Sequence, residues 1–338
     1  MKQLIMDEYS LKKLKDFEEI RQFLDFIRPY YPEINIEEDT IVEIEQSLFH
    51  TYIKLIGKII LFSPENMRRF LRTLLLKFEI SNIKQLILGS ITGMVKKEKS
   101  KRVNFFVEEL LEQKDFINNL LEITSLDEIQ LFMKNTRYNK AIREGILYFK
   151  NNAQIFVLEA FLDKEFYKNL KRSEETYSKK EAEMINLYIK YEIEIYNLKM
   201  ISRGIKNNID RKLLSQFLIN EFLFFNKEEL DYLLKFVNIE QFILYVEKYL
   251  RTDKELKSLL IPIELSRKHL KWSLEGLYQV YYFKKFKIKI DDIEYSTIFK
   301  ILELIIKKDR EIKFNIMPNV IRIIHKKYEE LDVMNDHF

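Results

Sequence analysis

Cysteine is absent from this chain, and glycine and proline are scarce. The 338 residues include six glycines and five prolines, whereas an average protein has about 7% glycine and 5% proline. Without cysteine there is no disulfide, thiolate nucleophile or cysteine-based metal site. Tight hairpins and phosphate-binding loops depend on glycine, while helix interiors avoid both residues. These shortages exclude several enzyme classes and favour an all-α fold.

The chain also lacks a strong charge of one sign and any long apolar run. Its 57 basic and 53 acidic residues leave a formal net charge of +4, which is too mild for a dedicated nucleic-acid binder. The longest apolar runs, such as 59–62 and 222–225, are far shorter than the roughly 18 residues that span a bilayer. The first eight residues do not resemble a signal peptide. We therefore expect a soluble, cytoplasmic protein.

Catalytic and metal-binding motifs are missing as well. Gly89-Ser90-Ile91-Thr92-Gly93 lacks the lysine of a phosphate-binding loop, and no nucleophile elbow is present. The four histidines are scattered without a ligand spacing, at His50, His269, His325 and His337. We predict a protein that is not an enzyme and that has no cofactor and no metal.

Helical periodicity and helix-start signals fill most of the chain. Apolar residues from Met184 to Ile205 follow the i, i+3, i+4, i+7 pattern. Ser63-Pro64, Ser125 and Asn226 are typical of helix starts. The run 96–102 indicates a linker or a solvated helix end, and the stretch 172–180 indicates a polar break. Residues 286–290 alternate with period two, as in a short strand or an exposed linker, and we interpret them as a connection.

An internal repeat with a long period organises these helices. Glu79-Ile80-Ser81-Asn82-Ile83-Lys84, followed by Gly89, matches Glu194-Ile195-Tyr196-Asn197-Leu198-Lys199, followed by Gly204, 115 positions later. A weaker third copy begins at Glu311 and contains Pro318. A second module, at 19–24, 128–133 and 241–246, recurs with nearly the same period. We predict three similar helical repeats, at 1–95, 96–220 and 221–338.

The repeated polar residues have two interpretations. The amides of Asn82 and Asn197 either bond a neighbouring loop or helix end inside the fold, or line a cavity and contact a partner. Glu194 and Lys199 either pair with other helices or form part of a solvated helix face, and we expect the solvated face. We expect Gly89 and Gly204 to be left-handed caps that end their helices.

These motifs resemble the C subunit of archaeal and bacterial V/A-type ATPases, whose counterpart in the vacuolar enzymes is the d subunit. The resemblance is carried by residues 194–199 with Ser202-Arg203-Gly204 and by Met133-Lys134-Asn135-Thr136-Arg137-Tyr138. It extends over nearly the whole chain. Leu88 stands in repeat 1 where repeat 2 has Arg203, so the copies are not identical.

The resemblance implies a funnel or cup of three helical repeats with pseudo-threefold symmetry. It implies a non-catalytic central-stalk subunit that binds no nucleotide and couples the central shaft to the membrane proteolipid ring, for proton or sodium transport. The protein would be peripheral at the membrane through that complex. The family-motif residues, structural or partner-facing, are Glu79, Asn82, Lys84, Glu194, Asn197, Lys199 and Arg203.

The alternative is a helical scaffold or nucleic-acid-binding adaptor. Residues 281–287 interleave aromatic and basic side chains, and residues 96–102 are rich in lysine. Such stretches bind single strands by stacking and charge, face anionic lipid headgroups, or form amphipathic core helices. No nucleic acid is expected if the resemblance holds.

Overall fold

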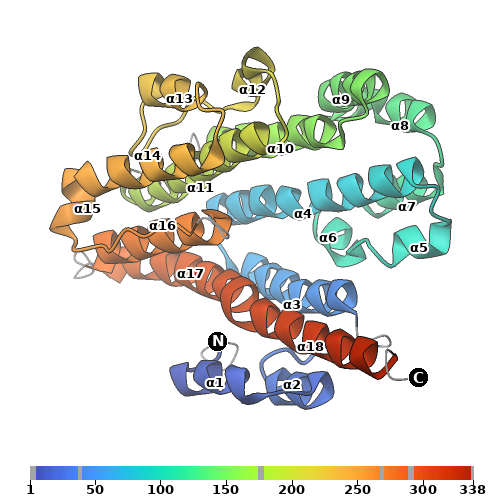
Figure 1. Ribbon diagram of the computed structural model, residues 1–338, viewed down its shortest axis with the longest axis horizontal. Helices are drawn as coiled ribbons and strands as arrows, with labels where there is room; N and C mark the ends of the chain where they lie inside the picture. The colour runs from blue at the N-terminus through green and yellow to red at the C-terminus, as the bar shows by residue number, and fades with distance from the viewer. Residues whose placement is uncertain (1–4, 37–39, 174–178, 267–269, 288–292, 336–338) are drawn as a thin grey trace. The chain divides into compact units, whose positions relative to one another are not determined.

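The computed structural model describes residues 5–36, 40–173, 179–266, 270–287 and 293–335. Within these ranges all regular elements are helices (Figure 1), which confirms the predicted all-α class. The chain divides into two compact units, one formed by residues 1–125 with 300–338 and the other by residues 126–299. We call them unit 1 and unit 2. The division into three repeats and their pseudo-threefold arrangement remain predictions.

Unit 1 is built from both ends of the chain. Its helices are α1 (Glu8–Lys13), η2 (Leu14–Asp16), α2 (Ile20–Ile27), α3 (Ile41–Phe62), α4 (Glu65–Ile91), α5 (Lys96–Ser100), α6 (Phe105–Leu110), α7 (Lys114–Glu122), the π-helix η5 (Glu311–Ile316) and α18 (Met317–Asn335). Helix α17 (Ile293–Arg310) leads from unit 2 into unit 1. Helix α18 lies beside α3 (Figure 1) and also packs on α2.

Unit 2 surrounds one long helix, α11. Its helices are α8 (Leu126–Phe132), η3 (Met133–Asn135), α9 (Asn139–Asn152), α10 (Ile155–Arg172), α11 (Lys179–Lys206), α12 (Arg211–Phe217), α13 (Lys227–Leu233), α14 (Ile239–Thr252), α15 (Lys254–Ser258) and α16 (Leu270–Lys287). Helices α10, α12, α14 and α16 all contact α11. Most α11 side chains from Met184 to Ser202 are buried, because a helix enclosed on several sides is apolar around most of its circumference.

The helix-start signals mark real starts with small shifts. Asn226 caps α13 by accepting from the Glu229 N–H at 2.9 Å. Helix α8 begins one residue after Ser125, and α4 begins at Glu65, one residue after Pro64. Of the two interpretations of 96–102, a linker or a solvated helix end, the structure has a short helix, α5, with mostly exposed side chains. The break at 172–180 lies partly outside the described residues, as does 288–290, whereas α16 stays helical through Lys287.

Candidate functional site

The repeated asparagines occupy equivalent positions on α4 and α11. Asn82 donates to the Asn104 carbonyl oxygen at 3.0 Å and accepts from the Asn104 N–H at 2.9 Å. Asn197 donates to the Ile219 carbonyl oxygen and accepts from the Ile219 N–H, both at 2.9 Å. Each partner lies 22 residues further along the chain. Each amide therefore fixes both backbone groups of one residue in the segment that follows its helix.

The repeated glycines are also equivalent, but their predicted role is wrong. Gly89 and Gly204 lie inside α4 and α11 and are not in the left-handed region. A Cβ atom at Gly89 would stand 2.8 Å from Lys99 Cγ, and one at Gly204 would overlap Leu214 Cδ2. The glycines are there because a neighbouring side chain packs directly against the helix backbone.

The left-handed cap lies four residues beyond each glycine. Gly93 has φ 70° and Asn208 has φ 52°. The following N–H groups, of Met94 and Ile209, return to the carbonyl oxygens of Gly89 and Gly204 at 2.8 and 2.9 Å. This is the six-to-one hydrogen bond of a Schellman cap. Three features therefore recur 115 residues apart: the Schellman cap, the asparagine bonds to one backbone residue, and the side chain packed against the glycine. Repeats 1 and 2 share local structure as well as sequence.

The repeated glutamates are buried, which corrects the solvated-face prediction for Glu194. Glu79, Glu194 and Glu311 are each at most 2% exposed. Glu194 accepts from the backbone N–H groups of residues 223–225 at 2.8–3.1 Å and from the Tyr278 hydroxyl at 2.7 Å. Burial raises the pKa of the Glu194 carboxyl, while the hydroxyl and the N–H groups lower it; the net direction is upward.

Glu311 makes a comparable set of bonds to the opposite end of the chain. Its carboxylate accepts from the Met6 N–H at 2.7 Å, from the Tyr31 hydroxyl at 2.6 Å and from Lys308 Nζ at 2.7 Å. The Lys308 ammonium also lies 3.6 Å from the centre of the Tyr31 ring. The third copy of the motif therefore joins the N-terminal segment to the C-terminal helices of unit 1.

The partners Tyr31, Lys308 and Tyr278 do not stand out as site residues in the sequence. A signal existed for Lys308, because it follows the apolar run 304–306 and precedes Glu311 by three residues, a spacing that pairs opposite charges on a helix. Pro318 does not end the helix, because it lies at the second position of α18, directly after the π-helix η5.

The remaining motif residues lie nearer the surface. Lys84 is half-buried on α4. Lys199 is half-buried and pairs with Glu275 of α16, so it does not belong to a freely solvated face. Arg203 is exposed, pairs with Glu159 at 3.0 Å and lies 4.6 Å from the centre of the Phe156 ring. The structure brings Glu194, Asn197 and Lys199 together on α11, facing different neighbours.

The basic-aromatic stretch of α16 packs inward. Tyr281, Tyr282 and Phe286 are fully buried. Lys284 donates to the carbonyl oxygens of residues 259 and 260, and Lys285 donates to Glu255 at 2.7 Å. Buried rings offer no face for a base to stack on, so this stretch is a core helix with lysines at its edge.

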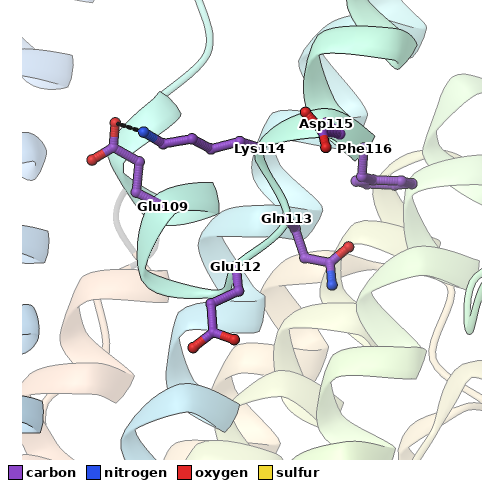
Figure 2. Close-up of a pocket in the computed structure, with 6 residues that line it drawn as sticks. All are labelled: Glu109, Glu112, Gln113, Lys114, Asp115 and Phe116. Atoms are coloured by element: carbon purple, nitrogen blue, oxygen red, sulfur yellow. Dashed lines mark ion pairs between the residues drawn. The ribbon is translucent and has the colours of Figure 1, made fainter.

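One hollow of about 460 Å³ opens at the turn between α6 and α7 in unit 1. It is lined by Glu109, Glu112, Gln113, Lys114, Asp115 and Phe116. Lys114 pairs with Glu109 at 2.9 Å, and Figure 2 shows the carboxyl group of Glu112 pointing away from that pair. Among the described residues, no three His, Asp or Glu side chains are grouped to hold a metal ion.

Within the described part of the chain, we find no helix with the length and apolar character needed to cross a bilayer.

Comparison with known proteins identifies the family. The model of the ATP synthase (C/AC39) subunit family matches residues 1–317. The A-type ATP synthase C subunit of Methanocaldococcus jannaschii is 27% identical over 192 residues, covering 56% of this chain and 46% of the relative. The A-type C subunits of Methanobrevibacter smithii and Methanothermobacter thermautotrophicus are 20% and 23% identical, each covering 64% of this chain and 55% and 54% of the relative.

The chain spans about half the length of the curated relatives that it matches. The family match, by contrast, covers almost the whole chain, including all three copies of the motif that carried the resemblance in the sequence. That resemblance is confirmed, and the chain belongs to the ATP synthase (C/AC39) subunit family.

Proposed function

We propose that the protein is a non-catalytic central-stalk subunit of a V/A-type rotary ATPase. It couples the rotating shaft to the membrane proteolipid ring and so links ATP hydrolysis or synthesis to proton or sodium transport. The observation that carries the proposal is the family match over residues 1–317. The relatives named as C subunits of A-type ATP synthases support the archaeal and bacterial type.

The internal bonds of the repeats suit a part that transmits torque. A coupling element must not bend under load, and closely packed helices deform little. The amides of Asn82 and Asn197 and the carboxylate of Glu194 tie long helices to the segments that follow them, at buried positions. We assign these residues and Glu79 to the frame of the protein, whereas the more accessible Lys84, Lys199 and Arg203 are the motif residues within reach of a partner.

Co-purification tests the proposal. Membranes of the source organism are solubilised in mild detergent, and an affinity tag on this chain is used to isolate its partners. We expect the proteolipid ring and the shaft subunits to elute together with the tagged chain. Recovery of an intact ATPase complex without this chain would refute the proposal.

A reconstitution experiment tests the coupling itself. Membranes depleted of this chain are expected to retain ATP hydrolysis by the catalytic head but to lose ATP-driven ion transport. Adding back the wild-type chain should restore transport. An Asn207→Ala chain is the control and should restore transport equally, because Asn207 is exposed and bonds only within its own helix end. Normal ion transport in the depleted membranes would contradict a coupling role.

A further inference from the structure

Helix α9 of unit 2 has one buried face and one basic face. Ala141, Ile142, Gly145 and Ile146 are buried, and α9 lies between α8 and α10, packing on both (Figure 1). Before the two asparagines that end the helix, the exposed positions are Lys140, Arg143, Leu147 and Lys150. At about 100° per residue these four side chains fall within a narrow arc of the helix surface. The face opposite the core is therefore a basic stripe with one leucine in it.

The segment just before α9 adds further exposed basic and apolar side chains. Leu131 of α8, Lys134 of η3 and Arg137 of the turn before α9 are all exposed. Leu131 is 73% exposed and Leu147 is 62% exposed. We call the surface formed by these seven residues the α8–α9 face: Leu131, Lys134, Arg137, Lys140, Arg143, Leu147 and Lys150.

The α8–α9 face has an unusual local charge. Residues 131–150 contain five basic side chains and one carboxylate, Glu144, so this short segment has as large a net positive charge as the entire chain. Glu144 lies 3.9 Å from Lys140 and 4.0 Å from Arg143, at the limit of an ion pair. Lys150 pairs with Asp127. No carboxylate of the described residues pairs with Lys134 or Arg137, so most of the positive charge is not neutralised within the protein.

We propose that the α8–α9 face binds an anionic phospholipid surface. Clustered Lys and Arg side chains are attracted to acidic headgroups, and exposed leucines among them insert into the boundary between headgroups and acyl chains. Both components are present in one arc of α9, where Leu147 lies among Lys140, Arg143 and Lys150. The inference goes beyond the coupling role, because it concerns a direct contact with lipid and requires no other protein.

The other basic segment of the chain provides a matched control. Helix α5 and its end present Lys97, Lys101 and Arg102. Lys99 of the same helix is buried and donates to the Ile123 carbonyl oxygen at 2.7 Å, and Lys96 pairs with Glu122. Only Val95 is an exposed large apolar side chain there. The α5 segment is thus as rich in basic residues as the α8–α9 face, but more of its charge is paired or buried and it exposes less apolar surface.

Vesicle sedimentation of the full chain tests the proposal. The vesicles consist of phosphatidylcholine alone or of phosphatidylcholine mixed with phosphatidylglycerol. We expect binding to the mixed vesicles, weaker binding at high salt because of screening, and little binding to phosphatidylcholine alone. The triple variant Lys134→Gln, Arg137→Gln, Arg143→Gln should bind at least about tenfold more weakly, because each basic side chain at an anionic surface strengthens binding about fivefold.

Two further variants separate the contributions. The variant Lys97→Gln, Lys101→Gln, Arg102→Gln removes the same charge from α5 and should bind within about twofold of the wild type. The variant Leu131→Ser, Leu147→Ser retains all charges and should bind more weakly at every salt concentration, since it removes the inserted apolar groups. All substituted side chains except Arg102 are exposed, and unchanged circular dichroism and thermal unfolding confirm that each variant is folded.

Three outcomes would overturn the proposal. They are no binding to the mixed vesicles, equal losses in the α5 and α8–α9 charge variants, and a triple variant that retains vesicle binding but no longer co-purifies with the ATPase complex. The last outcome would identify an acidic protein as the occupant of the face. Because the vesicle assay contains no other protein, its failure leaves the proposed coupling role standing.

Discussion

Asn197 bonds both backbone groups of Ile219, a residue that lies outside the helices. Its side chain is fully buried and bonds both the N–H and the carbonyl oxygen of Ile219. We predict that Asn197→Ala lowers the free energy of unfolding by about 2 kcal/mol, because the Ile219 N–H is left unsatisfied and a buried unsatisfied group costs about 1–3 kcal/mol. The Ile219 carbonyl oxygen keeps its bond from the Glu221 N–H at 2.9 Å. Urea unfolding measures the change.

Asn207 allows the same asparagine-to-alanine substitution to be made at an exposed position, as a control. Asn207 is exposed and donates only to the Arg203 carbonyl oxygen at 2.7 Å. Asn207→Ala should change the free energy of unfolding by less than about 0.5 kcal/mol, as is usual at the surface. If Asn197→Ala changed the free energy of unfolding as little as Asn207→Ala, the bonds between Asn197 and Ile219 would contribute little to stability.

The buried carboxyl of Glu194 makes stability depend on pH. Its pKa is raised by burial above the usual 4.5, so the native state holds the proton more tightly than the unfolded chain. The contribution of this group to the free energy of unfolding is therefore fully present below pH 4.5 and is lost as the pH rises through the folded-state pKa. We predict that the free energy of unfolding of the wild type minus that of Glu194→Gln declines from pH 4.5 upward.

Denaturant unfolding at a series of pH values checks this prediction. Glutamine retains the shape of the side chain but does not titrate. The pH dependence that comes from the other carboxyl groups is common to both proteins and cancels in the difference between them. A difference that increases with pH would mean that the four donors around Glu194 outweigh its burial and that its pKa is lowered.

At the scale of elements, the N-terminal segment and the C-terminal helices are joined through a buried ion pair. Lys308 and Glu311 side chains are 1% and 2% exposed and lie 2.7 Å apart. We predict that Lys308→Met destabilises unit 1 by about 3–5 kcal/mol, because it leaves the Glu311 charge buried without its cation. Hydrogen exchange of residues 5–27 should accelerate, since Met6 and Tyr31 bond the same carboxylate.

Lys326 provides the comparison at this scale. It also connects α18 to the N-terminal segment, through a 3.0 Å pair with Glu18, but both side chains are largely exposed. Lys326→Met should leave the exchange of residues 5–27 nearly unchanged, because exposed pairs contribute little. Equal acceleration in the two variants would show that burial of the Lys308–Glu311 pair is not what matters.

At the scale of the whole molecule, unit 1 requires both ends of the chain. Helix α18 packs on α2 and α3, whereas α11 has its neighbours within unit 2. We predict that a chain ending at residue 299 shows faster hydrogen exchange in α3 than in α11. Similar protection of both helices in the shortened chain would contradict the division into these units.

The sequence by itself determined the helical class, the family and the existence of a repeat. Few glycines, few prolines and a 3.6-residue apolar period are local properties that permit little besides helices. The equal spacing of Asn82 and Gly89 in one copy and Asn197 and Gly204 in the next is also visible without coordinates. The same spacing recurs because the same contacts are made twice.

Only the tertiary structure decided what those residues do. Whether Glu194 faces solvent or four hydrogen-bond donors depends on the loop at 223–225 and on Tyr278 of α16, which are distant in sequence. Gly204 is required by Leu214, and Glu311 by Met6, for the same reason. Periodicity identifies the face of a helix, but burial and pairing are properties of the elements that pack against it, and a single sequence does not say which elements these are.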